Sequence, residues 1–251
     1  MNFVFDLDGT ICFKGMPISK SIMDLLFELQ DSEHSICFAS ARPWRDMLPV
    51  LDRRFHDNLL VGANGAMIVK GNQLDHVEGI PVRLAERIIS LLEEFHADYL
   101  IDDTWNYAHN LSLDNPFLKN VDINGLASRV GVNEVKYFVK IVVLNCLDFS
   151  ALSKCLQQLD VTIHYHSTEG ILDLTYKQVN KMSGLIKTSF DSTDFICFGN
   201  DLNDKKLFEK ATHSVLIGEL PQLKLLAKEY ISVDDKIEER IVRKVRELIE
   251  K

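Results

Sequence analysis

The sequence has no long run of apolar residues, and its acidic side chains outnumber its basic ones. None of its apolar stretches approaches the roughly 20 residues that a helix needs to cross a bilayer. A formal net charge of −9 does not favour nucleic acid or an anionic membrane as a partner, because both would repel it. We therefore expect neither partner, and a phosphorylated ligand would need its own local cluster of cations.

The sequence also lacks any Cys-x-x-Cys pair, and its five cysteines are an odd number. This predicts reduced thiols rather than a disulfide framework. The first residues reach an acid at Asp6 and lack the basic, then apolar, layout of a signal peptide. The expected localisation is therefore cytoplasmic. An apolar content of 46% over 251 residues is enough for a sizeable buried core.

Strand and helix patterns alternate at both ends of the chain. Short apolar strands are expected at residues 2–7, 35–39 and 58–61, with helix patterns after the first two. A hairpin is expected around Gly71 and Asn72, and the alternation returns from about residue 180. Such alternation is typical of an α/β fold with a parallel sheet.

The middle of the chain has a different pattern. Paired strands joined by short turns accompany amphipathic helices, which favours an antiparallel sheet with helices on one face. We therefore predict an α/β core domain made of residues 1–79 and 179–251. Residues 80–178, called the cap segment below, are predicted to form an inserted α+β domain.

Two carboxylates follow the first predicted strand, in the sequence Asp-Leu-Asp-Gly-Thr at residues 6–10. Functional groups collect at the carboxyl ends of parallel strands. Asp6 and Asp8 point the same way if the extended geometry continues. One could attack phosphorus while the other protonates the leaving oxygen and later activates water. Gly9 would let backbone N–H groups approach phosphate oxygens, whereas an Asp-capped turn is the alternative.

Two further positions could bind an anion. Ser40 ends the second strand and precedes Ala41 and Arg42 at a helix start, although a simple helix cap would look the same. Lys181 stands at the start of another predicted helix, where the dipole disfavours a cation, so a nearby anion would explain it. The alternative is a solvated lysine, and Lys177 is the competing candidate.

An acidic loop follows the strand expected at residues 194–198. Residues 199–204 read Gly-Asn-Asp-Leu-Asn-Asp, and such hard oxygen donors suit Mg²⁺. A capped loop leading into the next helix is the alternative. Asn200, Asp201 and Asp204 all remain possible metal ligands.

Taken together, in this order, the four motifs resemble those of the haloacid dehalogenase superfamily. The long insertion between the second and third motifs, and Asn64 followed by Gly-Ala, resemble its Cof-like IIB phosphatases. The resemblance covers both core segments, while the cap segment matches only by position and α+β character. It implies an α/β fold with a Rossmann-like core and parallel sheet, plus an inserted type-two cap.

The resemblance also implies roles for individual residues. Asp6 is the expected nucleophile that forms an aspartyl-phosphate, and Asp8 is the expected general acid and base. One position departs from the pattern, because Asn200 stands where an aspartate is common. Phosphate or substrate contacts are expected from Gly9, Thr10, Ser40, Ala41, Arg42, Asn64, Lys181 and Asn203, catalytic roles from Asp6, Asp8, Ser40 and Lys181, and Mg²⁺ contacts from Asp6, Asp8, Asn200, Asp201 and Asp204.

The function predicted from these motifs is that of a Mg²⁺-dependent phosphatase acting on a small phosphorylated metabolite. The resemblance implies a sugar phosphate or a related phosphoester as substrate. A phosphomutase would use the same motifs, and a non-catalytic module that binds a phosphorylated ligand is a third possibility. The intact set of Asp6, Asp8, Ser40 and Lys181 argues against the last.

Overall fold

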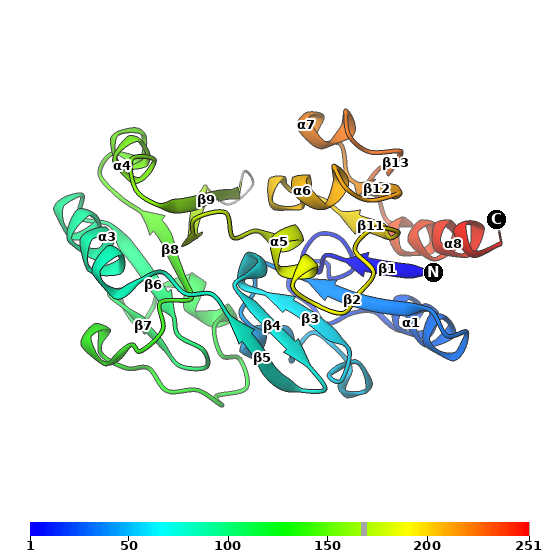
Figure 1. Cartoon of the computed structure of the whole chain (residues 1–251), viewed down its shortest axis with the longest axis horizontal. Coiled ribbons are helices and arrows are strands. Elements are labelled where there is room, and N and C mark those ends of the chain that lie inside the picture. The colour runs from blue at the N-terminus through cyan, green and yellow to red at the C-terminus, as the bar shows by residue number, and fades with distance from the viewer. Residues whose placement is uncertain (167–169, 251) are drawn as a thin grey trace.

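The computed structural model describes residues 1–166 and 170–250, which form two β-sheets next to each other along the long axis of the molecule (Figure 1). The larger sheet has the strand order β13-β12-β11-β1-β2-β3-β4-β5. Neighbouring strands are parallel from β13 to β3, and β4 and β5 add an antiparallel hairpin. Its strands are β1 (Asn2–Phe5), β2 (Ser35–Ala39), β3 (Leu59–Gly62), β4 (Met67–Lys70), β5 (Gln73–Val77), β11 (Ile196–Gly199), β12 (His213–Ile217) and β13 (Glu229–Ile231).

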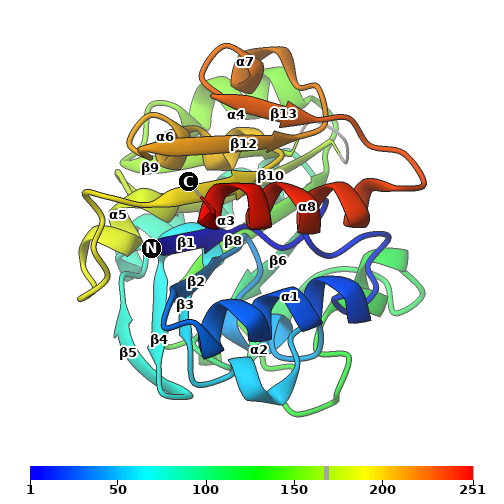
Figure 2. The same ribbon diagram turned by 90° about the vertical axis from the view of Figure 1, so that its right-hand side faces the viewer.

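Helices cover both faces of this sheet (Figure 2). Side chains alternate along β1, so Phe3 and Phe5 pack on one side and Val4 on the other. The side of Phe3 and Phe5 is covered by α1 (Lys20–Asp31), α2 (Trp44–Met47) and α8 (Ile237–Ile249). The opposite side is covered by α5 (Lys181–Ile186), α6 (Lys205–Phe208) and α7 (Pro221–Lys224).

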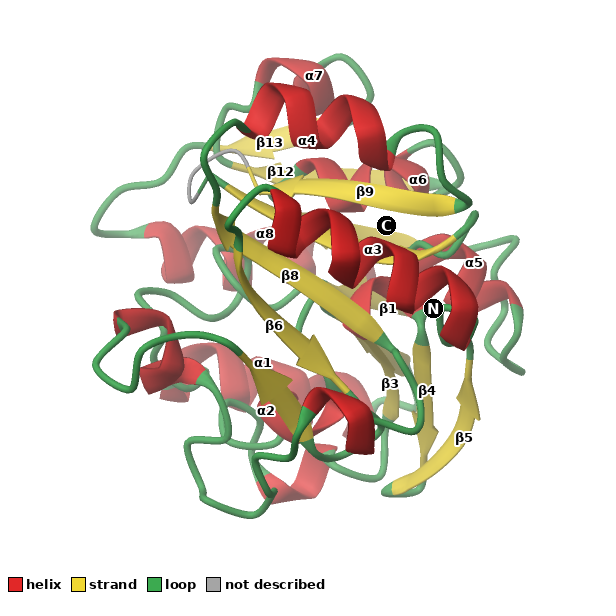
Figure 3. Ribbon diagram, turned by 90° about the vertical axis from the view of Figure 1, so that its left-hand side faces the viewer, coloured by secondary structure: helices red, strands yellow, loops and turns green. Residues whose placement is uncertain are grey.

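The second sheet lies within the cap segment and has the order β7-β6-β8-β10-β9, with every pair antiparallel. Its strands are β6 (Asp98–Asp102), β7 (Tyr107–His109), β8 (Lys140–Asn145), β9 (Val161–His166) and β10 (Ile171–Tyr176). Two helices, α3 (Val82–Glu94) and α4 (Phe149–Leu156), cover one face of it (Figure 3). Short 3₁₀ turns complete the chain: η1 (Arg53–Phe55), η2 (Ala63–Gly65), η3 (Pro116–Asn120), η4 (Val132–Glu134) and η5 (Leu202–Asp204).

The two faces of the cap sheet differ in what they contact. Ile101, Ile141 and Val143 pack against α3 and α4 in one apolar cluster. The alternate residues Leu100 and Val142 lie on the opposite face in a separate cluster. This second face is turned toward the larger sheet, because both residues line a cavity that also reaches Asp6 (see below).

The predicted fold class is confirmed: a core with a parallel sheet carries an inserted α+β cap. Strand β8 begins at Lys140, and Phe138 just before it forms an isolated bridge with Ile80. The division of the chain into domains at residues 80 and 178 stays a prediction. No helix among the described residues is long and apolar enough to cross a membrane.

Candidate active site

Asp6 lies directly after β1, the strand at the middle of the core sheet. Its backbone N–H donates to the Phe198 carbonyl of β11 at 3.0 Å, which continues the parallel ladder by one residue. Its side chain is buried, and one carboxylate oxygen accepts a hydrogen bond from Lys181 Nζ at 2.6 Å. The other accepts one from Thr10 Oγ1 at 2.8 Å. Contacts with Phe198, Lys181 and Thr10 therefore fix both the backbone and the two side-chain oxygens of Asp6.

Lys181 is fully buried between two carboxylates and is not a solvated lysine. Its ammonium group donates to Asp6 Oδ1 and to Asp204 Oδ1, both at 2.6 Å. Asn180 caps α5 by accepting from the N–H of Ser183, which fixes the helix start that carries Lys181. Gly65 allows this placement, since a Cβ there would lie 2.1 Å from the Asn180 carbonyl oxygen.

The charges of Asp6 and Lys181 depend on each other. Burial raises the pKa of Asp6 to about 7, with Lys181 opposing the shift and Asp204 adding to it. Burial by itself would lower the pKa of Lys181, but the carboxylates of Asp204 and Asp6 raise it well above its ordinary value. Lys181 therefore stays charged, and Asp6 would gain from a further cation close to it.

Asp8 is held by an arginine from the next strand end. Arg42 donates two parallel hydrogen bonds, from Nε and Nη2, to the two carboxylate oxygens of Asp8, each 2.7 Å long. The Arg42 guanidinium also donates to the Asp46 carbonyl at 3.1 Å, and its backbone N–H donates to Ser40 Oγ at 3.1 Å. The second motif therefore orients the second carboxylate of the first motif.

In the loop after β11, the three candidate metal ligands lie in different surroundings. Asp204 is fully buried; one oxygen faces Lys181, and the other accepts from the backbone N–H groups of Asn200 and Asp201 at 2.9 and 3.2 Å. Asp201 accepts from the N–H of Leu202 at 2.8 Å. Protein donors thus occupy both oxygens of Asp204, whereas Asn200 and Asp201 line the cavity described below.

The side-chain oxygen of Asn200 lies close to Asp6. Thr10 Oγ1, which donates to Asp6, is also 3.4 Å from Asn200 Oδ1. Gly9 packs tightly on the same amide, because a Cβ there would be 2.1 Å from Asn200 Nδ2. One side-chain oxygen of Asp6 and one of Asn200 therefore both lie next to the Thr10 hydroxyl, and both are hard donors of the kind that Mg²⁺ prefers.

These residues fit a Mg²⁺ ion. Among the described residues, no three His, Cys, Asp or Glu side chains form a ready-made metal cluster. Mg²⁺ does not require one, since it commonly takes one or two carboxylates and keeps several waters. Around Asp6 the four carboxylates of Asp6, Asp8, Asp201 and Asp204 outnumber the cations of Lys181 and Arg42. A divalent cation would restore the balance that a phosphate dianion needs.

A cavity of about 600 Å³ opens above these groups and is bounded by the cap segment on its other side. Of the predicted site residues it is lined by Asp6, Asp8, Gly9, Ser40, Ala41, Arg42, Asn200, Asp201 and Asn203. Thr10, Asn64, Lys181 and Asp204 are buried behind this surface and contact its residues. The four motifs therefore meet at one place.

Asn64 joins the core to the cap segment. Its backbone has a positive φ of 55°, its Nδ2 donates to Asp173 Oδ2 of β10 at 2.9 Å, and its Oδ1 accepts from Asn203 at 3.1 Å. Lys140 of β8 donates to the Ala41 carbonyl at 2.8 Å and lies 3.3 Å from Asp173. Asn64 thus contacts the cavity indirectly, because its side-chain partners Asp173 and Asn203 both line it.

A second group of buried charges crosses between core and cap. Arg45 donates to Asp102 Oδ1 of β6 at 3.0 Å, to the Trp105 carbonyl at 2.7 Å and to the carboxylate of Asp46. Asp46 in turn accepts from the backbone N–H of Asp122 at 2.8 Å. These contacts fix the cap against α2, one turn from Arg42.

Sequence reasoning missed the charged cap residues Asp102, Lys140 and Asp173. Lys140 and Asp173 are the single charges of their strands, Asp102 ends a strand that begins with Asp98, and all three are buried. That pattern was the available signal, because charged side chains are seldom fully buried unless paired. His164 is buried, and its Nε2 is 2.9 Å from Thr175 Oγ1. The side chain of His166 lies outside the described residues.

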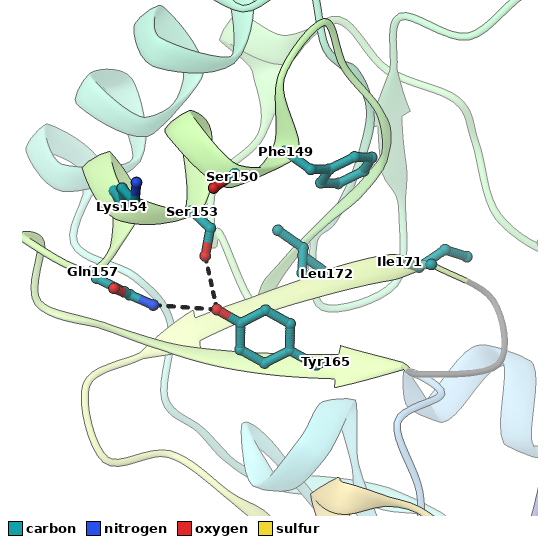
Figure 4. A pocket seen from close by; sticks show the side chains of 9 residues that line it. Phe149, Ser150, Ser153, Lys154, Gln157, Tyr165, Ile171 and Leu172 are labelled. Atoms are coloured by element: carbon teal, nitrogen blue, oxygen red, sulfur yellow. Dashed lines mark hydrogen bonds between the residues drawn. The ribbon is translucent and has the colours of Figure 1, made fainter.

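Another cavity, of about 610 Å³, lies between α4 and strands β9 and β10 (Figure 4). There Tyr165 shares hydrogen bonds with Ser153 at 2.7 Å and Gln157 at 3.3 Å. None of the predicted site residues lines it. The chemistry-bearing groups therefore belong to the cavity above Asp6.

A family model of haloacid dehalogenase-like hydrolases matches residues 3–237. The chain belongs to this family. The predicted superfamily, its Cof-like branch and the hydrolase class are thereby confirmed. The short motifs at Asp6, Ser40, Lys181 and residues 199–204 were sufficient to identify it.

Named relatives and solved structures match most of the length of this hydrolase. An HMP-PP phosphatase of Yersinia enterocolitica is 24% identical, over 88% of this chain and 85% of its own length. A 5-amino-6-(5-phospho-D-ribitylamino)uracil phosphatase of Bacillus subtilis is 21% identical, over 85% and 84%. A protein of Streptococcus mutans shares the fold with a TM-score of 0.84 and 17% identity, covering 100% of this chain and 99% of its own. A sugar phosphatase of subclass IIB shares it with a TM-score of 0.79 and 17% identity, covering 98% of each.

Proposed function

We propose that this hydrolase is a Mg²⁺-dependent phosphatase that transfers the phosphoryl group of a small metabolite to Asp6 and then to water. The observation that carries the proposal is the position of Asp6, oriented by Lys181 and Thr10 at the floor of a cavity that also exposes Asp8. Relatives that match along most of the chain are named phosphatases, which supports the same class of reaction.

In the first step a carboxylate oxygen of Asp6 attacks phosphorus, and the bond from phosphorus to the leaving oxygen breaks. Asp8 gives its proton to that oxygen, and Arg42 stabilises the carboxylate that remains. Lys181 offsets charge on Asp6 and on the phosphoryl oxygens beside it. Ser40 supplies a hydroxyl at the cavity wall to bind one of those oxygens.

In the second step Asp8 takes a proton from water, whose oxygen attacks the phosphorus of the aspartyl-phosphate. Inorganic phosphate leaves, and Asp6 is a free carboxylate again. Asp6, the backbone carbonyl of Asp8, and Asn200 would hold Mg²⁺; the side-chain oxygens of Asp6 and Asn200 near the Thr10 hydroxyl support this for those two residues. When bound, the ion reduces repulsion between carboxylate and phosphate and aligns the two for attack.

The test uses acetyl phosphate, a small activated acyl phosphate that needs little of the cap. Wild-type protein with Mg²⁺ should release inorganic phosphate, and Asp6→Asn should not, because an amide is a poor nucleophile. Acid-quenched wild-type protein should carry a phosphoryl group on the peptide that contains Asp6. Turnover by Asp6→Asn above a few per cent of wild type, or full activity in excess chelator, would contradict the proposal.

A further inference from the structure

A chain of side-chain hydrogen bonds runs from the cap sheet into the core beside the cavity. It begins at Asp173 of β10, whose Oδ2 accepts from Asn64 Nδ2 at 2.9 Å. Asn64, in η2, accepts in turn at its Oδ1 from Asn203 Nδ2 at 3.1 Å. Asn203 belongs to η5, the turn that also carries Asp204 next to Lys181. Three elements that lie far apart in the sequence are therefore joined through two amide groups.

The direction of these hydrogen bonds is determined at the cap end. A carboxylate only accepts hydrogen bonds, so Asn64 has to turn its Nδ2 toward Asp173. That leaves Oδ1 of Asn64 for Asn203, which must therefore present its own Nδ2. The ammonium group of Lys140 lies 3.3 Å from the same oxygen of Asp173 and supplies the countercharge for this buried carboxylate. The acid of the cap thus sets which way both amides point.

The amide of Asn203 lies at the cavity above Asp6. Its Oδ1 is buried and has no hydrogen-bond partner among the residues that the structure describes. Because that oxygen is enclosed, Nδ2 is the polar side-chain atom through which Asn203 can contact a ligand in the cavity that it lines. Asn64 takes one of the two N–H groups of Nδ2, and the other can donate to an anionic oxygen. With the amide reversed, an acceptor would stand there and would repel the anion.

We propose that Asp173 of the cap is a positioning residue for phosphoryl transfer. Acting through Asn64, it holds the amide of Asn203 so that an N–H, and not the oxygen, is offered to the phosphoryl group above Asp6. This rests on the proposed phosphatase activity. The cap then contributes to the reaction of every substrate, including one with too few atoms to contact the cap itself.

Acetyl phosphate separates this role from a direct contact between Asp173 and the leaving group, because an acetyl group has no N–H or O–H to donate to a carboxylate. We expect Asp173→Ala to lower kcat/KM for acetyl phosphate roughly 10-fold, since the amide of Asn64 can then turn its oxygen toward Lys140. Asn203→Ala should lower it roughly 10-fold to 100-fold, the range for one hydrogen bond to a charged group.

Two further variants complete the set. Asn64→Gly removes the amide between Asp173 and Asn203 and suits the positive φ of 55° at that position, so its loss should match that of Asp173→Ala. Asp160→Ala is the control: this cap carboxylate pairs with Lys177 outside the cavity, and its loss should leave kcat/KM unchanged.

A double-substitution cycle distinguishes positioning from a general loss of structure. If Asp173 acts through Asn203, Asp173→Ala should lower kcat/KM by less than about 2-fold once residue 203 is already alanine. Losses that multiply in the double variant, or a normal kcat/KM in Asp173→Ala, would overturn the inference and leave the phosphatase proposal standing. Asp173→Leu, which fills the same space, replaces the alanine variant if circular dichroism shows that one to be unfolded. If wild-type protein does not hydrolyse acetyl phosphate, the phosphatase proposal fails and this inference fails with it.

Discussion

Arg42 and Asp8 come from different strand ends and meet through two hydrogen bonds of equal length, 2.7 Å each. Asp8 follows β1 and Arg42 follows β2, which are neighbours in the parallel sheet. The pairing determines where the second carboxylate points, since the side chain of Asp8 is about half exposed. The proposed acid and base is thus oriented by the residue that also binds Ser40 through its backbone.

Replacing this arginine tests the importance of orientation. We expect Arg42→Lys to lower kcat by about 10-fold to 100-fold, because lysine keeps the charge but cannot form the two-pronged contact. KM should change less than kcat. Steady-state kinetics with wild-type protein and with Arg54→Lys, whose arginine pairs with Asp52 outside the cavity, provide the comparison. A normal kcat in Arg42→Lys would mean that Asp8 needs no such partner.

The metal prediction separates Asn200 from Asp204. Asn200→Ala should raise the Mg²⁺ concentration for half-maximal activity by about 10-fold or more, because a side-chain oxygen beside Asp6 is lost. Asp204→Asn should instead impair activity even at saturating Mg²⁺, since Lys181 loses one of its two carboxylate partners. Titration of activity with Mg²⁺ distinguishes the two. An Asp204→Asn protein that extra Mg²⁺ fully restores would identify Asp204 as the ligand.

The free energy of unfolding should depend on the close approach of Gly65 to the start of α5. A Cβ at Gly65 would lie 2.1 Å from the Asn180 carbonyl oxygen, whereas one at Gly71 would meet nothing within 4 Å. Both residues have positive φ, so alanine is strained at either position. Urea denaturation should show Gly65→Ala less stable than Gly71→Ala by about 1–3 kcal/mol. Equal losses would show that the contact with Asn180 relaxes without cost.

The proposed domain division can be tested by excision. Replacing residues 80–178 with a short linker should leave a folded core, because the larger sheet has its own apolar clusters on both faces. Arg45 and Asp46 would then lose their cap partners but keep each other. Circular dichroism and acetyl phosphate hydrolysis are the measurements. A core that is wholly unfolded would contradict a separable cap.

The sequence predicted the core and its motifs well because the relevant signals are local. Asp6 and Ser40 each follow an apolar strand directly. Each is therefore placed at the carboxyl end of its strand, whatever the rest of the chain does. The α/β alternation before residue 79 and after residue 180 likewise needs no long-range information. The predicted fold class and family followed from these signals.

The cap side of the site could not be read in the same way. Asp102, Lys140 and Asp173 belong to three strands whose pairing brings them together, and no local pattern encodes that register. The loop at residues 199–204 has a related difficulty. Its composition names three possible ligands, but only the fold shows that Lys181 and two backbone N–H groups occupy both oxygens of Asp204.

The central place of β1 has a consequence for the newly made chain. β1 pairs on one side with β2, made soon afterwards, and on the other with β11, at Ile196–Gly199. The whole cap segment is synthesised between these two partners, and Lys181 and Asp204 follow it. A nascent or truncated chain that stops before residue 181 therefore holds Asp6 without Lys181 and without the loop at residues 199–204. The catalytic centre is completed late in translation, by the closing of a long-range contact.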